Sequence, residues 1–193
     1  MSDMQDKTSS AHSDQELIDA LRDTRCEAAF RELYRRHTPR LLRLIMRILG
    51  GADAEDVVQD TWIRAVEHLS SFRGEAQFRT WLTRIGVRLS QDHLRKRKHA
   101  HLRLETAMEP ASRDMPIAER IDLERLFARL PEGYRSILLL HDLEGYTHAE
   151  IGGMLGIAEG TSKSQLHDAR RLAQEIFDGR TLPKVRRAPT ANA

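Results

Sequence analysis

The sequence predicts an all-α protein built from two small helical domains that a flexible linker joins. Apolar residues recur at helical spacing in nearly every segment that is expected to be ordered. The alternation of β-branched and polar residues that is typical of β-strands is absent. The periodicity fades between residues 100 and 118, where Pro110 and Pro116 stand among polar residues, as expected of a linker. A length of 193 residues suits one or two small domains.

The charges are unevenly distributed, although the net charge is only +2. The first residues are acidic, whereas the chain after Arg180 carries bases and no acid. We therefore expect local contacts with anionic partners rather than nonspecific binding. The predicted organisation is a disordered lead, a first domain, the linker, a second domain and a disordered basic tail, at residues 1–13, 14–99, 100–118, 119–178 and 179–193.

The first domain should open with a short helix near Asp14. A longer helix is expected over residues 26–49, with apolar side chains at helical spacing that include Tyr34. Pro39 lies inside it and is expected to kink the helix or split it in two. The glycine pair at residues 50 and 51 should end it.

The next helix should begin at Asp53, a plausible N-cap that acids follow in the first turn. Its apolar stripe comprises Val58, Trp62, Ala65 and Leu69. Its other stripe comprises Asp56, Gln59, Asp60, Ile63 and Glu67. That second stripe is either a solvated face or a docking face for a basic partner, and periodicity leaves both interpretations open.

The stretch "SSFRGEAQFRTWLTRIGVR", residues 70–88, places aromatic residues among arginines. It predicts a loop and then a helix from about Gln77 to about Lys98. Aromatic faces can stack on unpaired bases while arginines neutralise the phosphates. The same spacing also suits a core, to which we assign Phe78 and Leu82, with Trp81 left between the two interpretations.

The second domain carries the clearest pattern, a helix, a tight glycine turn and a second helix over residues 147–174. Thr147 should cap the first of these helices and Gly156 should form the turn. The residues expected to face inward are Ala149, Ile151, Leu155, Ile157, Leu166, Ala169, Leu172 and Ala173. Polar donors on the leading face of the second helix suit base edges and phosphates in a major groove. These donors are Thr161, Ser162, Lys163, Gln165, His167, Arg170 and Arg171. The alternative is an ordinary helical hairpin with a solvated face, and Asp168 must point away from phosphates or pair with Arg170 or Arg171.

Several function classes find no support. Cys26 is the single cysteine, which excludes an intramolecular disulfide and cysteine-based zinc modules and suits a reducing, cytoplasmic compartment. No apolar run approaches the roughly 18 residues of a membrane helix, so we expect no direct membrane insertion. The histidines lack a chelating spacing and the common catalytic motifs are missing. We expect no metal site, no cofactor and no enzymatic activity.

The motifs, in their order, resemble the sigma subunits of bacterial RNA polymerase, and more narrowly the extracytoplasmic function (ECF) subfamily, which keeps only sigma regions 2 and 4. The resemblance covers residues 26–98 and 123–176. It rests on "DAEDVVQDTWIRA", "SFRGEAQFRTWLTRI", "QDHLRKRK" and the long stretch "LPEGYRSILLLHDLEGYTHAEIGGMLGIAEGTSKSQLHDAR". It implies a region 2 helical bundle and a region 4 helix-turn-helix.

The resemblance also implies partners. Core RNA polymerase would be bound through its β′ clamp helices, by Asp56, Gln59, Asp60 and Ile63, and through its β flap. The −10 promoter element would be bound by Phe72, Arg73, Arg79, Trp81, Arg84 and Arg88, the first two in a loop that captures a flipped base. The helix from Thr161 to Arg171 would read the −35 element. An anti-sigma factor, often membrane-tethered, would hold the protein inactive.

The chain departs from the family pattern at some positions. Arg88 and Gly86 stand where the family usually has Asn and Ala, and Ser162, Gln165 and Asp168 stand where it often has Val and two Arg. Arg88 would add a phosphate contact or change the base preference. The lower charge of the helix that carries Ser162, Gln165 and Asp168 predicts weaker phosphate binding or another element sequence. The rival functions are a free-standing dimeric helix-turn-helix regulator, a metal-dependent nuclease and an adaptor that binds no nucleic acid.

Overall fold

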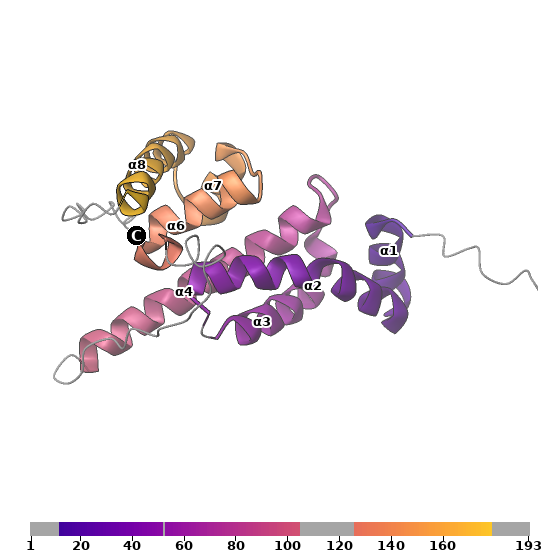
Figure 1. Cartoon of the computed structure of the whole chain (residues 1–193). Coiled ribbons are helices and arrows are strands. Elements are labelled where there is room, and N and C mark those ends of the chain that lie inside the picture. Colours follow the sequence, from indigo (N-terminus) through magenta and orange to yellow (C-terminus); the bar gives the residue numbers. More distant parts are fainter. Residues whose placement is uncertain (1–11, 52, 105–125, 179–193) are drawn as a thin grey trace, which may run out of the picture.

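The computed structural model describes residues 12–51, 53–104 and 126–178, and every regular element in these ranges is a helix (Figure 1). The all-α prediction is confirmed. We call residues 12–104 the first module and residues 126–178 the second module. The predicted lead up to residue 11, the predicted linker from residue 105 onward and the basic tail from residue 179 lie outside the described residues.

The first two helices begin and end as elementary capping rules require. Helix α1, Asp14–Thr24, opens with a capping box in which the Ser13 hydroxyl accepts from the Glu16 amide and the Glu16 carboxylate accepts from the Ser13 amide. Helix α2, Glu27–Leu49, ends at Gly50 in the left-handed conformation. It runs unbroken through Pro39, so the predicted split is wrong.

Helix α3, Ala54–Glu67, follows, and then the 3₁₀ turn η1, Leu69–Ser71, and the long helix α4, Phe78–Leu104. Asp53 occupies the N-cap position of α3 as predicted, but its carboxylate makes no capping bond and lies 3.0 Å from Nε2 of His93 on α4. The contact ties the start of α3 to α4. Helix α4 passes the predicted end near Lys98, so the first residues of the predicted linker are helical.

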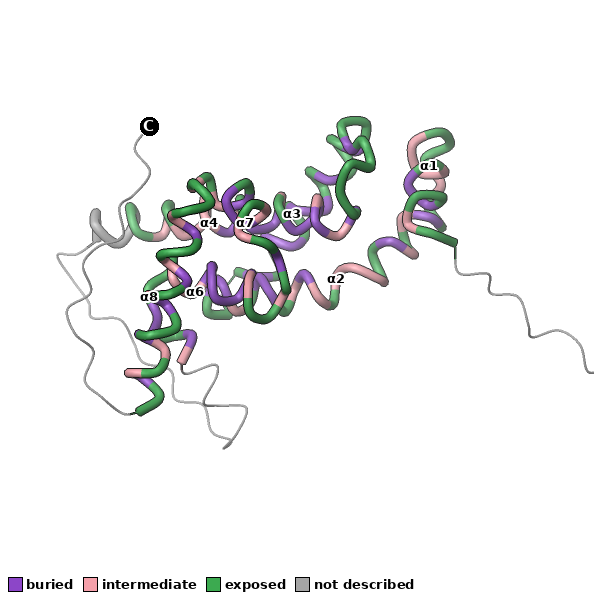
Figure 2. The backbone as a smooth tube through the Cα atoms, turned by 90° about the horizontal axis from the view of Figure 1, so that it is seen from above, coloured by how far each residue is buried: buried purple, intermediate pink, exposed green. Residues whose placement is uncertain are grey.

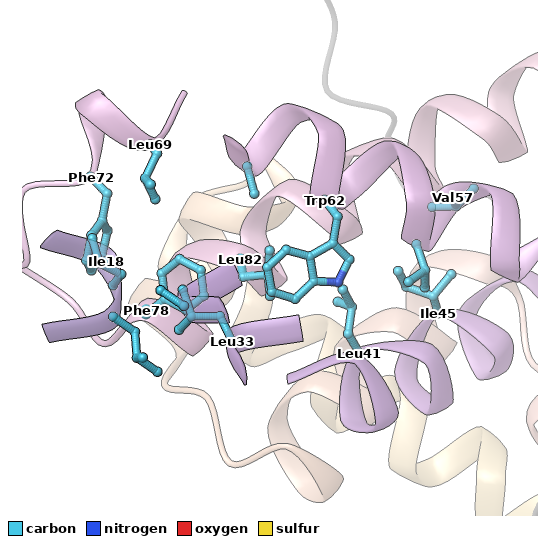
Figure 3. Close-up of a cluster of buried hydrophobic side chains, with 14 of the residues drawn as sticks. Ile18, Leu33, Leu41, Ile45, Val57, Trp62, Leu69, Phe72, Phe78 and Leu82 are labelled. Carbon is cyan, nitrogen blue, oxygen red and sulfur yellow. The ribbon is translucent and has the colours of Figure 1, made fainter. Parts of the chain in front are cut away.

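Aromatic and aliphatic side chains from four helices fill the core of the first module (Figure 3). Ile18 of α1 lies toward one end of this core, and Leu33 of α2, Trp62 of α3 and Leu82 of α4 lie within it. The indole Nε1 of Trp62 donates to the Thr38 hydroxyl over 3.0 Å, which satisfies the one polar atom of that side chain. Tyr34, which the sequence pattern counts among the apolar positions, is exposed instead.

The second module contains a helical segment over residues 126–129, then α6, Glu132–Leu138, which continues into the π-helical segment η2, Leu139–Leu143. Helices α7, His148–Leu155, and α8, Glu159–Phe177, form the helix-turn-helix. Thr147 caps α7 in a capping box with Glu150, and Gly156 makes the left-handed turn, as predicted. Ala149 is exposed and not inward-facing.

The two modules pack against each other, which the sequence did not predict. Helices α6 and α7 lie against α2 and α4 (Figure 1), and α8 is the outermost helix of the second module. Leu44, Ile48 and Val87 of the first module share one apolar cluster with Ile137 and Ile151 of the second. Buried stretches on α2, α4 and α7 therefore face a common interior (Figure 2).

Candidate polymerase-binding and DNA-binding surfaces

The acidic stripe of α3 is a free surface. Asp56, Gln59 and Asp60 are exposed, and Ile63 retains 56% of its accessible surface. The opposite stripe, with Trp62 at its centre, is buried and fixes the rotation of the helix. This face therefore presents carboxylate and amide groups together with one apolar side chain to the surroundings.

The loop between η1 and α4 begins with Phe72, which the structure buries. Its ring meets the ring of Phe78 edge to face at a centroid distance of 5.7 Å, and only 5% of the residue is exposed. Arg22 of α1 donates to the carbonyl oxygens of Phe72 and of Leu69, the latter over 2.9 Å. In this structure the Phe72 ring is therefore part of the core and anchors the loop, and it is not exposed for stacking on a base.

The rest of this loop is open to ligands. Arg73 is exposed, and the next residue, Gly74, has a φ of +75°, a conformation that favours glycine. A cavity of about 600 Å³ lies beside the loop, with His37 and Arg79 among its lining residues. Burial lowers the pKa of His37, although the adjacent Asp14 carboxylate acts in the opposite direction. The cavity is large enough for a nucleobase.

The basic face of α4 is divided between solvent and the second module. Arg88 is exposed, and Trp81 is half-buried against Phe72 at a centroid distance of 5.3 Å. The guanidinium group of Arg79 lies over the Tyr146 ring, 5.8 Å from its centroid. Arg84 is exposed, yet its guanidinium group lies close to the backbone of α7 at Gly153. The structure thus covers part of the face that the sequence assigns to the −10 element.

Most of the predicted DNA-reading residues of α8 reach the surface. Lys163, His167, Arg170 and Arg171 are exposed, and Thr161 and Gln165 are half-buried. Ser162 is completely buried, and its hydroxyl lies 3.0 Å from Nδ1 of His148. This hydroxyl therefore joins α7 to α8 and is not exposed to a ligand while the two helices stay packed.

The bases of α8 have carboxylate partners within the chain. Arg170 binds Asp142 through two hydrogen bonds, of 2.5 and 3.0 Å, and this contact lowers the pKa of Asp142. Arg171 lies 3.3 Å from Glu175 and 3.8 Å from Asp168, which confirms the expected pairing of Asp168. Exposed ion pairs of this kind contribute little to stability, so these bases can exchange a carboxylate for a phosphate.

Comparison with known proteins identifies the family. Residues 33–100 match the family described as Sigma-70 region 2, and residues 120–172 match Sigma-70, region 4. The chain is 38% identical over 162 residues to the ECF RNA polymerase sigma factor SigM of Mycobacterium tuberculosis. The aligned region covers 82% of this chain and 83% of that protein. The chain belongs to the ECF family of RNA polymerase sigma factors. This family consists of non-catalytic subunits for transcription initiation.

Solved sigma-factor structures share the fold of this ECF sigma factor. The sigma factor RpoE of Bartonella quintana, in complex with the anti-sigma factor NepR, superposes with a TM-score of 0.67 at 23% identity, over 77% of this chain and 96% of that chain. CnrH in complex with the cytosolic domain of CnrY superposes with a TM-score of 0.63 at 25% identity, over 87% of this chain and 99% of that chain. The α3 face and α4 lie in the region 2 match, and α7 and α8 lie largely in the region 4 match.

Some contacts of this sigma factor carry no signal in its sequence. The rings of His141 and His148 stack at a centroid distance of 4.7 Å, and Arg40 of α2 binds Glu144 at the end of η2. The partners in each pair belong to separate elements, and helical periodicity does not say which elements meet. Within the described ranges, no group of three or more His, Cys, Asp or Glu is gathered for a metal ion. None of the described helices has the length and apolarity needed to cross a bilayer.

Proposed function

We propose that this ECF sigma factor binds core RNA polymerase, recognises the −10 and −35 promoter elements, helps to melt the promoter and directs initiation. One observation carries the proposal: a single chain presents an exposed acidic and apolar face on α3, exposed arginines on and beside α4, and a helix-turn-helix with basic residues. These surfaces lie in the order of sigma regions 2 and 4.

The α3 face is the proposed docking site for the β′ clamp helices of the polymerase. Asp56, Gln59 and Asp60 supply acceptors for basic and polar groups, and Ile63 supplies an apolar contact that docking would desolvate. The second module would contact the β flap. Binding of this kind excludes water from the centre of the contact and leaves the charges at its rim.

The −10 element is proposed to bind where α4 meets the loop before it. Extrusion of a base costs a few kcal/mol of stacking, and capture in a pocket recovers roughly 1–3 kcal/mol per base. The cavity beside Gly74 offers the space, and Arg73, Arg79, Trp81, Arg84 and Arg88 offer the aromatic and cationic groups. Because the cost of unstacking the base and the gain from its capture nearly cancel, the protein alone should bind duplex promoter weakly.

The −35 element is proposed to bind α8 in the major groove. Thr161, Lys163, Gln165, His167, Arg170 and Arg171 form the reading face once Ser162 is removed from the set. Side chains near the start of a recognition helix contact base edges, and the arginines farther along contact phosphates. The internal carboxylate partners of Arg170 and Arg171 would be displaced by DNA.

Control by an anti-sigma factor is part of the proposal. Support comes from the family and from the sigma factor neighbours, which were solved as complexes with NepR and with the cytosolic domain of CnrY. We further propose that the protein has no catalytic activity of its own and works in the cytoplasm, where an anti-sigma factor could hold it at the membrane face.

In-vitro transcription tests the proposal directly. Purified core polymerase that lacks other sigma subunits is combined with this protein and a library of promoter fragments. We expect start-site-specific transcripts only when the protein is added, and their sequences would yield both promoter elements. The proposal fails if no transcripts form while the protein alone binds a palindromic duplex tightly, since that outcome identifies a free-standing regulator.

A further inference from the structure

A small cavity lies where the two modules meet. Its volume is about 240 Å³, and α2, α4 and the end of η2 form its walls. Three arginines line it, with one glutamate opposite them: Arg36, Arg40, Arg79 and Glu144. An excess of guanidinium groups around a partly enclosed space is typical of an anion site, because guanidinium donors match the oxygens of phosphate and carboxylate groups.

The three arginines differ in how well they are satisfied. Arg36 is occupied by Glu32, Asp14 and the His12 carbonyl oxygen. Arg79 has a buried Nε atom without a hydrogen-bond partner among the described residues. A buried donor that is left unpaired points to a ligand that completes it. Arg79 is therefore available to an incoming anion.

Glu144 is the carboxylate that faces the arginines of this cavity, and it pairs with Arg40. Its side chain is only 10% exposed, and Oε2 accepts from Nε of Arg40 over 2.5 Å. Residues 40 and 144 belong to different modules, so this carboxylate reaches the site only while the modules stay packed. Glu144 thus stands where an external anion would meet Arg40.

We propose that Arg40 and Arg79 form a binding site for a backbone phosphate of a separated DNA strand, and that Glu144 fills this site in the packed arrangement. The carboxylate and the phosphate then exclude each other. Arg40 becomes a DNA-contacting residue beyond those that the sequence pattern indicates. Naming a DNA strand as the ligand rests on the proposed function.

The Tyr146 ring reinforces this competition. The guanidinium carbon of Arg79 lies 5.8 Å from the centroid of this ring. The Tyr146 hydroxyl donates a hydrogen bond to Thr83, which lies on α4 as Arg79 does. A strand that follows the face of α4 must displace both Tyr146 and Glu144. Release of the second module and capture of the strand are therefore one event at this site.

The test is Glu144→Gln in the full-length protein, with a fluorescent dT₂₀ strand as probe and anisotropy as readout. The substitution keeps the size of the side chain and removes its charge. We expect an affinity about threefold to tenfold higher than in the wild type, because Arg40 no longer has to leave a carboxylate. Glu132→Gln, at an exposed position of α6, is the matched control and should leave the affinity unchanged.

Arg40→Gln decides whether Arg40 itself binds the phosphate. It should lower the affinity of the wild type, reduce the slope of log affinity against log salt by about 0.7, and cancel the gain in the Glu144→Gln background. A double variant that keeps the gain overturns the site, as does Glu144→Gln with unchanged or weaker binding. If Glu144→Gln fails to fold, the salt slope of Arg40→Gln alone decides, and an unchanged slope overturns the proposal.

Two further arms separate the alternatives. The first arm compares the thermal unfolding midpoint of Glu144→Gln in inorganic phosphate and in chloride at equal ionic strength. We expect no increase of the midpoint in phosphate. A clear increase would show that a free anion is the ligand, and would overturn the assignment to a strand. The transcription assay is independent of these measurements. A gain in strand binding without sigma-dependent transcripts supports the phosphate site and refutes the proposed function.

Discussion

The phenolic hydroxyl of Tyr146 donates a hydrogen bond to the hydroxyl of Thr83 over 3.0 Å, and both residues are buried. Tyr146 belongs to the second module and Thr83 to α4 of the first. Burial raises the pKa of Tyr146, which keeps the phenol protonated as the donor. A specific polar contact thus supplements the apolar cluster that the two modules share.

Removal of this donor should weaken the packing of the modules. Tyr146→Phe leaves the buried Thr83 hydroxyl without its partner, and we expect the free energy of unfolding to fall by about 1 kcal/mol. Urea unfolding followed by circular dichroism measures the loss. Tyr34→Phe, at an exposed ring, is the control and should change nothing; equal effects of the two substitutions would mean that the contact contributes nothing.

The acidic face of α3 can be tested with a single truncation. Asp60→Ala removes an exposed carboxylate, and we expect core polymerase binding to weaken about tenfold, a loss of about 1.4 kcal/mol, with unfolding unchanged. Biolayer interferometry with immobilised core polymerase is the measurement. Asp23→Ala, on an exposed site of α1, controls for net charge. Normal binding by Asp60→Ala would refute the docking face.

The turn of the helix-turn-helix depends on a close approach at Gly152. A Cβ atom there would stand 2.7 Å from the carbonyl oxygen of Ile157, which is backbone and cannot rotate away. Gly152→Ala should therefore lower the free energy of unfolding by about 1–3 kcal/mol. Gly133→Ala, where a Cβ atom meets open space, should be neutral or slightly stabilising in the same thermal unfolding assay. A stable Gly152→Ala variant would contradict this packing.

Acidification should destabilise the first module through His37. Burial lowers the pKa of this imidazole in the folded protein. In the unfolded chain its pKa has the ordinary histidine value of about 6.5. The unfolded state therefore takes up more protons below that pH, and stability falls as the pH drops from about 6.5 through the folded pKa.

The measurement is urea unfolding at pH 7.5 and pH 5.5 for the wild type and for His37→Gln. The variant should lose less stability between the two values, because its side chain does not titrate. An equal loss in both proteins would assign the pH dependence to other groups, such as His148, whose pKa is also lowered.

Capping and periodicity made much of the fold predictable. Thr147, Gly50 and Gly156 act locally, since their effect depends on a few neighbouring residues, and each stands where the pattern placed it. The acidic stripe of α3 is exposed for the same reason, because a helix with one apolar stripe buries that stripe. Pro39 shows the limit of a local rule, since α2 runs through it, with Leu33 before it and Leu41 after it both buried.

The candidate site was less predictable, because polarity alone does not say which polar side chains are covered. Ser162 reads as a surface donor, yet His148 of the neighbouring helix closes over it. Phe72 stands in a loop beside an arginine, yet its ring completes the aromatic core with Phe78. Both outcomes depend on how separate elements pack against each other, and helical spacing contains no information about that packing.

The sequence by itself determined the family, the all-α class, the caps and the order of the surfaces, because these depend on residue type and on neighbours within a few positions. The tertiary structure alone decided how the modules meet. The pairs Arg40–Glu144 and Thr83–Tyr146 join residues more than sixty positions apart. Such contacts arise only when helices have packed, since burial brings together side chains that no local rule connects.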